Sequence, residues 1–150
     1  MTEVINVKEL QTPPWEPKVQ HRFIVKVKNF SSWSIFRIER PKANWDFGSV
    51  SYIWQPIEME LYDPICPSTS QLVYELIETH NNQLGDITLK LLGPVGDVVE
   101  NWTLQNCSIL RIDFGELDWS IESERRPKQK PKKGFTTIKL LIQYTAELEF

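Results

Sequence analysis

The C-terminal sequence FTTIKLLIQYTAELEF, residues 135–150, decides the fold. One set of alternate positions is apolar without interruption, and it comprises Ile138, Leu140, Ile142, Tyr144, Ala146, Leu148 and Phe150. The positions between them are mostly polar, and they comprise Thr137, Lys139, Leu141, Gln143, Thr145, Glu147 and Glu149. This alternation is typical of a strand in an antiparallel sheet that is buried on one face and solvated on the other.

The predicted strand is too long for a domain of this size. Sixteen residues at about 3.3 Å each would span about 50 Å, and strands of five or six residues are the norm. A chain of 150 residues folds to a globule about 30–35 Å across, because its radius of gyration is about 15 Å. We therefore expect this strand to bend, to carry a bulge, or to belong to a sheet larger than the monomer.

The same alternation predicts further strands over residues 22–28, 32–40, about 50–62, 86–92, 98–104 and 107–114. The side chains expected on their buried faces include Phe36 and Ile38, then Ile57, Met59 and Leu61, and finally Leu110, Ile112 and Phe114. The sequence GPVGD at 93–97 predicts a turn that joins its flanking strands into a hairpin. A loop is predicted at 41–49, with Trp45 and Phe47 at its tip.

One helix is predicted between the strands. Ser68 and Gln71 have capping-box spacing at its start, and Gly85 is expected to supply a left-handed stop. The apolar stripe of this helix comprises Leu72, Val73, Leu76, Ile77 and His80. Such a stripe needs a sheet to cover, so the sequence predicts one helix packed on many strands.

Residues 1–21 are interpreted as an extended N-terminal arm in front of a single domain over residues 22–150. Pro13, Pro14 and Pro17 fix the backbone φ angle and remove hydrogen-bond donors, so a core element is not expected there. Trp15 needs an apolar surface, which its own domain or a neighbouring subunit could provide.

The composition excludes several classes of protein. A hydrophobic fraction of 41% is normal for a folded domain, and a net charge of -3 argues against a general nucleic-acid binder. Cys66 and Cys107 stand far apart, and we expect two buried, reduced thiols. The sequence has neither an apolar run long enough for a membrane span nor a signal peptide, so we expect a soluble protein.

No set of residues suggests catalysis, a metal or a cofactor. His21 and His80 form no ligand motif. Glu58 and Glu60 could form an acid/base pair, but neighbours on one strand face rarely create a substrate cleft. The glycines stand alone, without a phosphate-binding loop. We therefore expect a protein that is not an enzyme.

A basic segment precedes the last strand, and its cations are Arg125, Arg126, Lys128, Lys130, Lys132 and Lys133. Three interpretations stay open for it: an exposed loop without a partner, a contact with an acidic protein, and a contact with phosphates irrespective of sequence. No aromatic residues for base stacking are interleaved with these cations.

Three stretches together resemble the tail tube protein family of contractile-tailed bacteriophages. They are HRFIVKVKNFSSWSIFRIE at 21–39, YIWQPIEMELYDPICPSTSQLVYELI at 52–77, and GDVVENWTLQNCSILRIDFGELDWSIES at 96–123, which the long final strand follows. The resemblance covers about residues 22–150. It implies a mainly β (α+β) fold, an antiparallel β-sandwich or barrel with one flanking α-helix. Its inner strands would join a 24-stranded barrel built by six subunits.

The resemblance also implies partners and a place of action. Rings would stack into a conduit through which DNA leaves the virion without specific binding, inside a contractile sheath. Besides other copies of the chain, the implied partners are the tail sheath protein and the baseplate, tape measure and tail terminator proteins. The implied location is the tail of the virion, assembled in the host cytoplasm.

Several residues receive roles from this resemblance. The channel-facing candidates are Lys139, Gln143, Thr145 and Glu147. The candidate ring-stacking loop comprises Asn44, Trp45, Asp46, Phe47 and Gly48. Pro14 and Trp15 are the candidate inter-subunit arm, and the six cations of the basic segment are candidates for contact with the sheath or another partner.

Three alternatives remain open. The chain could be a specialised tube component, such as a baseplate or neck initiator or a terminator. It could also be the tube protein of a contractile injection system or a type VI secretion system. A small ligand-binding β-barrel is an alternative of a different class, and it predicts a closed apolar interior and a monomer.

Overall fold

A computed structural model describes residues 16–119 and 134–150, with His80 described by its backbone alone. The elements in chain order are β1 (Phe23–Val27), the short 3-10 helix η1 (Ser32–Ser34), β2 (Ile35–Ile38), β3 (Lys42–Asp46), β4 (Ser51–Gln55), β5 (Ile57–Tyr62), α2 (Thr69–His80), β6 (Gln83–Leu92), β7 (Val98–Asp113) and β8 (Thr137–Glu149). Within the described residues, no helix has the length and apolar character needed to cross a membrane.

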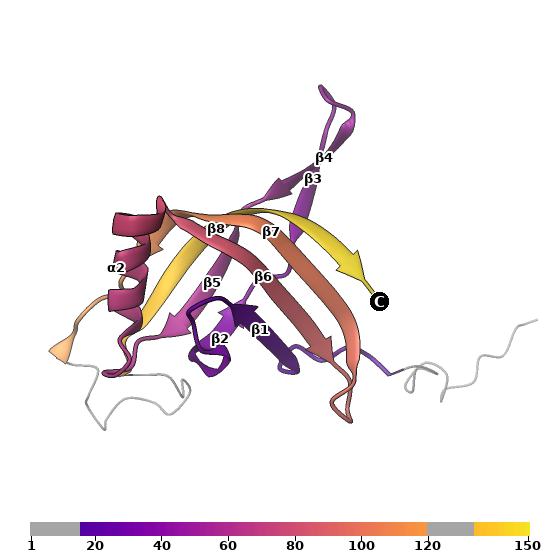
Figure 1. Cartoon of the computed structure of the whole chain (residues 1–150). Coiled ribbons are helices and arrows are strands. Elements are labelled where there is room, and N and C mark those ends of the chain that lie inside the picture. Colours follow the sequence, from indigo (N-terminus) through magenta and orange to yellow (C-terminus); the bar gives the residue numbers. More distant parts are fainter. Residues whose placement is uncertain (1–15, 120–133) are drawn as a thin grey trace, which may run out of the picture.

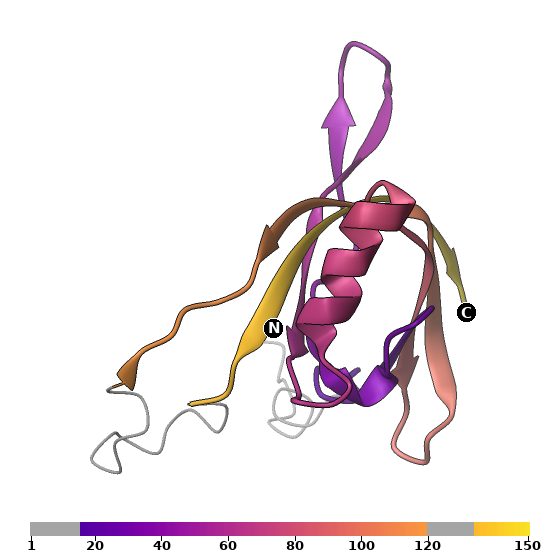
Figure 2. The ribbon, with the colours of Figure 1, turned by 60° about the vertical axis from the view of Figure 1, so that its left-hand side comes forward.

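Six strands form one antiparallel sheet in the order β1-β6-β7-β8-β5-β2, which curls into a nearly closed barrel (Figure 1). The helix α2 lies across one end of this barrel, as the rotated view shows (Figure 2). The strands β3 and β4 form a separate two-stranded sheet that projects from the barrel. This mainly β fold, a barrel-like sheet with one flanking helix, confirms the fold class predicted from the sequence.

The barrel core is centred on β5 and β8. Their inward residues pair in register, with Ile57 opposite Ile142, Met59 opposite Leu140 and Leu61 opposite Ile138, and all six side chains are fully buried. Burying each such side chain stabilises the fold by about 1.5–3 kcal/mol. The alternation of the sequence therefore predicted the inward face of both strands correctly.

The helix begins where the sequence predicted. The Ser68 hydroxyl accepts a hydrogen bond from the backbone N–H of Gln71 at 3.3 Å, and Val73 turns its side chain completely into the core. The predicted stop at Gly85 is wrong, since Asn81 ends the helix in the left-handed conformation at φ 50°. Asparagine tolerates this conformation better than most residues. Gly85 lies in β6 instead.

The strands predicted at 98–104 and 107–114 are one strand, β7, of 16 residues. Its register shifts beside Asn106, which has φ 52°. An extra residue in a strand moves the following side chains to the opposite face. Cys107 and Ile109 consequently point inward, whereas Leu110 is 53% exposed, so the predicted inward orientation of Leu110 is wrong.

Two other strand predictions need similar corrections. The segment 32–40 starts as η1, and an irregularity between Ile35 and Arg37 makes Ile35 and Ile38 the inward pair, in place of Phe36 and Ile38. The strand predicted at about 50–62 is interrupted at Pro56 and forms β4 and β5. Proline lacks the N–H that a continuous ladder requires.

Candidate assembly surfaces

The apolar face of β8 is only partly covered. Exposure along this face is 0% at Ile142 and 3% at Tyr144, and it rises to 36% at Leu148 and 92% at Phe150. The strand itself spans Thr137–Glu149 within the predicted 135–150. The alternation is thus present along the whole strand, but the monomer buries only its first part.

Backbone pairing of β8 stops at the same place. β5 pairs with residues 137–142 of β8, and among the described residues nothing pairs with that side of residues 143–149. The opposite side of β8 pairs with β7 along nearly its whole length. Residues 143–149 therefore have one open edge, and such an edge presents unpaired N–H and C=O groups to any strand that approaches.

β7 has a matching open edge at its other end. Its ladder with β6 ends at the pair Gln83–Ser108, and only the bond from the Ile109 N–H to the Asn82 carbonyl lies beyond it. Over residues 110–113 the described part of the chain pairs with β8 alone. The two open edges lie on opposite sides of the β7–β8 pair.

The outward face of β8 is polar, as predicted. Lys139, Gln143, Thr145 and Glu147 are all exposed. Opposite them in β7 stand, in the same order, Asp113, Ser108, Gln105 and Thr103. These eight residues form one hydrated surface across the two longest strands. That this surface lines a channel stays a prediction, because the structure contains a single chain.

The segment predicted as a loop at 41–49 is part of a β-hairpin. Asn44, Trp45 and Asp46 belong to β3, and only Phe47 and Gly48 of the candidate stacking residues lie in the turn. The Asp46 carboxylate accepts hydrogen bonds from the Gly48 N–H at 3.1 Å and the Ser49 hydroxyl at 2.8 Å. An aspartate whose carboxylate accepts a hydrogen bond from the backbone N–H two residues later favours a turn. The sequence DFGS at 46–49 carries this signal, which the loop prediction did not use.

The tip of this hairpin is aromatic and carries a negative charge. The Trp45 ring contacts Tyr52 and Phe47 edge-on, at centroid distances of 5.1 and 6.4 Å, yet Phe47 remains 86% exposed. Hydrogen bonds donated by Ser49 and Gly48 lower the pKa of Asp46. The tip therefore presents exposed rings beside an ionised carboxylate.

The base of the hairpin is fixed to the barrel. The Trp54 ring packs against Trp102 and Tyr144, at centroid distances of 6.3 and 6.0 Å. The Tyr144 hydroxyl accepts a hydrogen bond from the backbone N–H of Lys42 at 3.0 Å. These contacts anchor the hairpin to β7 and β8, so its tip is held away from the barrel (Figures 1 and 2).

A buried carboxylate lies where the barrel fails to close. Glu100 of β7 is 1% exposed, and it binds Lys18 at 2.6 Å and Arg40 at 2.7 Å. Lys18 precedes β1 and Arg40 follows β2, so the two ion pairs hold the segments next to both edge strands against β7. Trp102 also donates its indole N–H to Glu100. Glu100 stands 82 positions from Lys18 and 60 positions from Arg40, so no local sequence pattern predicts this cluster.

Opposing effects act on the pKa of Glu100. Burial would raise it, but hydrogen bonds donated by Lys18, Trp102 and Arg40, together with the charge of Arg40, bring the pKa below its ordinary value of 4.5. The carboxylate is therefore ionised at neutral pH, and its charge holds Lys18 and Arg40 against β7.

A groove of about 500 Å³ opens beside this cluster, between the start of β1 and the end of β2. We call it the seam groove. Its apolar floor includes Leu89 and Leu91 of β6, which are 1% and 7% exposed. Its charged lining comprises Lys18, Arg37, Glu39 and Arg40. Arg37 also pairs with Glu58 at 2.7 Å and lies 3.9 Å from Glu60.

Other residues singled out in the sequence fall into two groups. Pro14, Trp15 and the six cations of the basic segment lie outside the described residues. Of the cysteines, Cys107 is fully buried, and burial raises the pKa of its thiol to about 12. Cys66 is exposed, so the prediction of two buried thiols is wrong. Within the described ranges, no three His, Cys, Asp or Glu side chains gather closely enough to hold a metal ion.

No family model and no curated protein matches the chain. Solved structures do match it over nearly its whole length. A chain from the sheath/tube terminator of the PVC extracellular contractile injection system is 14% identical and aligns with a TM-score of 0.63, covering 91% of this chain and 99% of that one. This chain shares its fold with a component of a contractile injection system.

Two further structures share this fold. A chain from the tube-terminating cap of the anti-feeding prophage is 14% identical with a TM-score of 0.59, covering 90% of this chain and 92% of that one. A chain from the six-fold symmetrised baseplate of the same prophage is 17% identical with a TM-score of 0.54, covering 90% and 97%. At these identities the likeness confirms the predicted resemblance at the level of the fold.

Proposed function

We propose that the chain is a non-enzymatic structural subunit of a contractile tail tube, and that its copies form six-membered rings that stack into a conduit inside a sheath. The open edges of β7 and β8 carry this proposal. Each is a row of backbone groups that a larger sheet would satisfy. The tube fold and the partly uncovered apolar face of β8 support the same conclusion.

The two edges suit a ring because they are different and lie on opposite sides of one sheet. The edge at residues 143–149 of one copy would pair with the edge at residues 110–113 of the next. Copies related by rotation about a ring axis keep similar strand directions, so this pairing would be antiparallel, like the β7–β8 pair within the monomer. A contact between unlike surfaces, repeated by rotation, closes a ring.

The hydrated face of β7 and β8 would then line the lumen. Lys139, Gln143, Thr145 and Glu147 are the channel-facing candidates. Their mixture of neutral and oppositely charged groups, in a chain of net charge -3, would bind phosphate only weakly. A weakly binding wall suits a conduit through which DNA passes, and the phage tail is therefore our first assignment.

An injection machine is the second candidate. The observation in its favour is that the matching solved structures described above belong to an extracellular contractile injection system and an anti-feeding prophage. A cap or baseplate component is included here, because two of those structures are a cap and a baseplate.

Light scattering and negative-stain electron microscopy of the purified chain test the proposal. Rings with a central hole are expected, and stacked tubes would favour the main tube subunit. Single rings that never stack would favour an initiator or a terminator. A compact monomer at high concentration would contradict the proposal.

The remaining partner assignments follow from the same function. The hairpin tip at Phe47 and Gly48 would contact the next ring, and Pro14 and Trp15 would reach a neighbouring subunit. The basic segment from Arg125 to Lys133 would contact the sheath or another acidic partner. Baseplate, tape measure and terminator proteins would bind at the ends and in the lumen of the tube.

A further inference from the structure

The two open edges of the β7–β8 pair carry opposite charges. Arg111 is exposed on the edge at residues 110–113, and Glu147 and Glu149 are exposed on the edge at residues 143–149. Within the described residues, these three side chains form no ion pair. A cation on one edge and anions on the other suit a contact between copies, since opposite charges across an interface favour one orientation of the partners.

Arg111 and Glu149 cannot meet within one chain. Arg111 lies opposite Leu141 of β8. Leu141 precedes Glu149 by eight residues, which separate the two along the strand by about 26 Å. The charged atoms of an ion pair lie within about 4 Å of each other, so the acidic end of β8 can reach Arg111 only from another copy.

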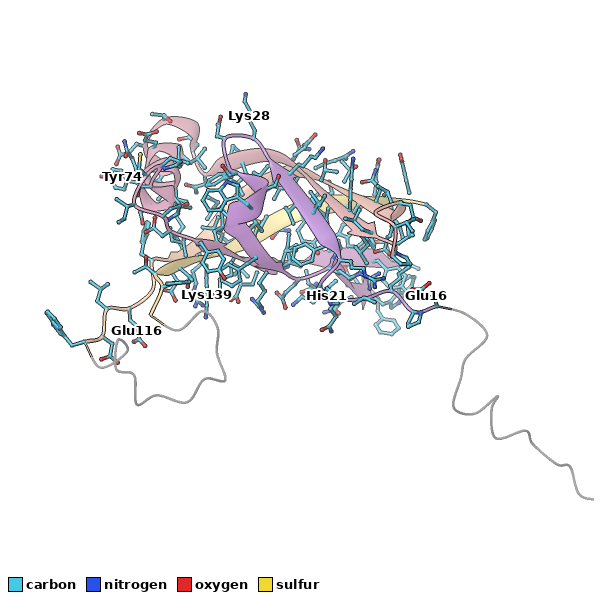
Figure 3. All side chains as sticks on the ribbon, turned by 90° about the horizontal axis from the view of Figure 1, so that it is seen from below. Glu16, His21, Lys28, Tyr74, Glu116 and Lys139 are labelled. Atoms are coloured by element: carbon cyan, nitrogen blue, oxygen red, sulfur yellow. The ribbon has the colours of Figure 1, made fainter. Side chains whose placement is uncertain are left out.

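The two edges lie towards opposite ends of the barrel. In Figure 3, Lys139 near the start of β8 and Glu116 just after β7 lie towards one end, and Glu16 lies at the other. The end of β8 is near Glu16, because the Lys18 ammonium lies 5.8 Å from the centre of the Phe150 ring. One copy therefore presents its cationic edge towards one end and its anionic edge towards the other, as a head-to-tail contact requires.

The faces of the strands restrict how the edges can pair. Ile112 lies opposite the buried Leu140, so it points inward and its neighbour Arg111 points outward. Leu148 belongs to the apolar face of β8, so its neighbour Glu149 also points outward. Opposite residues of an antiparallel pair share a face, and a shift of one residue would exchange the faces. Only registers that differ by two residues therefore keep the apolar side chains together.

Cover for Leu148 favours one of these registers. With Arg111 opposite Glu149, Ile112 lies opposite Leu148 on the inward face. A shift of two residues back along β8 would set Leu110 opposite Leu148, and Leu110 is 53% exposed in place of pointing inward. The opposite shift would move Arg111 past Glu149, where β8 ends. The register with Arg111 opposite Glu149 therefore covers the apolar face and pairs the charges.

The remaining charges at this contact are compensated. Asp113 would lie opposite Glu147 of the next copy, but on its other side it lies opposite Lys139 of its own chain. The Asp113 carboxylate also accepts a hydrogen bond from the Gly115 N–H at 2.8 Å. Glu147 would be a diagonal neighbour of Arg111, within reach of its long side chain. The two carboxylates therefore do not oppose the register.

We propose that Arg111 of one copy forms an ion pair with Glu149 of the next copy, and that this pair fixes the register and direction of the contact that closes the ring. The inference rests on the proposed function, because it names the charged residues of the contact between the two open edges. The pair lies on the hydrated face, where dissolved salt screens it. Ring formation should therefore weaken as the salt concentration rises.

Charge reversal and charge exchange test the proposal. Arg111→Glu would set two carboxylates opposite each other, and we expect the protein concentration at which half of the chains form rings to rise by about tenfold, because like charges across an interface are disfavoured. Glu149→Arg should have the same effect. The double variant Arg111→Glu/Glu149→Arg restores opposite charges and should form rings near the concentration of the parent. Analytical ultracentrifugation measures this concentration, and circular dichroism checks that each variant is folded.

The matched control is Lys26→Glu, which changes the net charge by the same amount as Arg111→Glu. Lys26 is exposed on β1, where it lies opposite Thr88 of β6 and outside both open edges. We expect this variant to form rings at the same concentration as the parent. A loss of rings in Arg111→Glu alone would then come from the local contact.

Cysteine cross-linking measures the register itself. In a Cys66→Ser background, which removes the exposed thiol, Arg111→Cys and Glu149→Cys chains carry tags of different mass and are mixed under mild oxidation. A disulfide-linked dimer with both tags is expected, because opposite residues of paired strands have Cβ atoms about 4.5–5.5 Å apart. Arg111→Cys mixed with Gln143→Cys, which is six residues away on β8, should give no such dimer.

The outcomes separate this inference from the proposed function. If the parent forms rings but Arg111→Glu forms them equally well, or if the double variant assembles no better than the single variants, the ion pair does not exist and the tube function stands. The same holds if Lys26→Glu weakens rings as much as Arg111→Glu, or if Arg111→Cys links to Gln143→Cys in place of Glu149→Cys. If the parent chain remains a monomer, both proposals fail.

Discussion

The two halves of β8 share one alternating sequence pattern, but they differ in strand pairing and in burial. Residues 137–142 pair with β5 on one side and β7 on the other, and their apolar face is fully buried. Residues 143–149 pair with β7 alone, and exposure on the same face rises from 3% at Tyr144, which Trp54 covers, to 36% at Leu148. The alternation thus tells which face of a strand is apolar, but the cover for that face can come from the same chain or from another copy.

The strongest way to test this contrast is a charge in the covered half. Leu140 is fully buried between Met59 of β5 and Ile112 of β7. Leu140→Asp would bury an unpaired carboxylate, which costs about 3–5 kcal/mol and is a large part of the stability of a domain. We expect an unfolded or aggregated chain by circular dichroism. A soluble, folded Leu140→Asp variant would refute the assignment of the inward face.

The segments next to β1 and β2 offer a second contrast, because ion pairs with Glu100 hold them against β7. Glu100→Gln removes the ion pairs with Lys18 and Arg40, and we expect a loss of about 1–2 kcal/mol, since both cations are half exposed. Urea unfolding at pH 7 measures this loss. A variant as stable as the parent would show that the cluster contributes nothing to stability.

The pH dependence supplies the matched measurement. The folded pKa of Glu100 lies below the ordinary 4.5, so its stabilisation is fully present above pH 4.5 and disappears as the pH falls through the lower, folded pKa. Between pH 7 and acidic pH, the parent should therefore lose more stability than Glu100→Gln. Parallel acid profiles for the two proteins would contradict the role of the carboxylate.

A charge in the uncovered half should act on assembly alone. Leu148→Asp places a carboxylate at a position that is already 36% exposed, so we expect a stability change under about 1 kcal/mol. If a neighbouring copy covers this face, light scattering should show the loss of rings and a folded monomer. Rings that persist in Leu148→Asp would show that the second half of β8 is not an interface.

Regular strands were predictable, and irregular ones were not. The period of two residues located the inward faces of β5 and β8, because both strands keep a constant phase. The same period gave the wrong inward residues beside Asn106 and at Ile35. At both places the register shifts, so the following side chains change faces, and the order of apolar and polar residues does not reveal that shift. The hairpin was not predicted, because segment 41–49 was interpreted as a loop. The turn-forming hydrogen bond of Asp46 with the backbone N–H of Gly48 is the signal that would have indicated a hairpin.

The candidate surfaces differ in how far the local sequence predicts them. The polar face of β8 follows from local alternation, so its exposed residues were named correctly. The Glu100 cluster and the seam groove are formed by segments that only the barrel brings together. Likewise, the open edges depend on where pairing with β5 and β6 stops, and no local pattern encodes that limit.

The smallest expected effect belongs to the hydrated face. Glu147 is exposed and stands opposite Thr103, so Glu147→Gln should change the unfolding free energy by no more than about 0.5 kcal/mol. It should also leave rings intact, because it removes a charge from the proposed lumen and adds nothing to an interface. Leu148→Asp, one residue away on the opposite face, should abolish rings. Two adjacent substitutions with the same effect on assembly would mean that the two faces of this half-strand do not have separate roles.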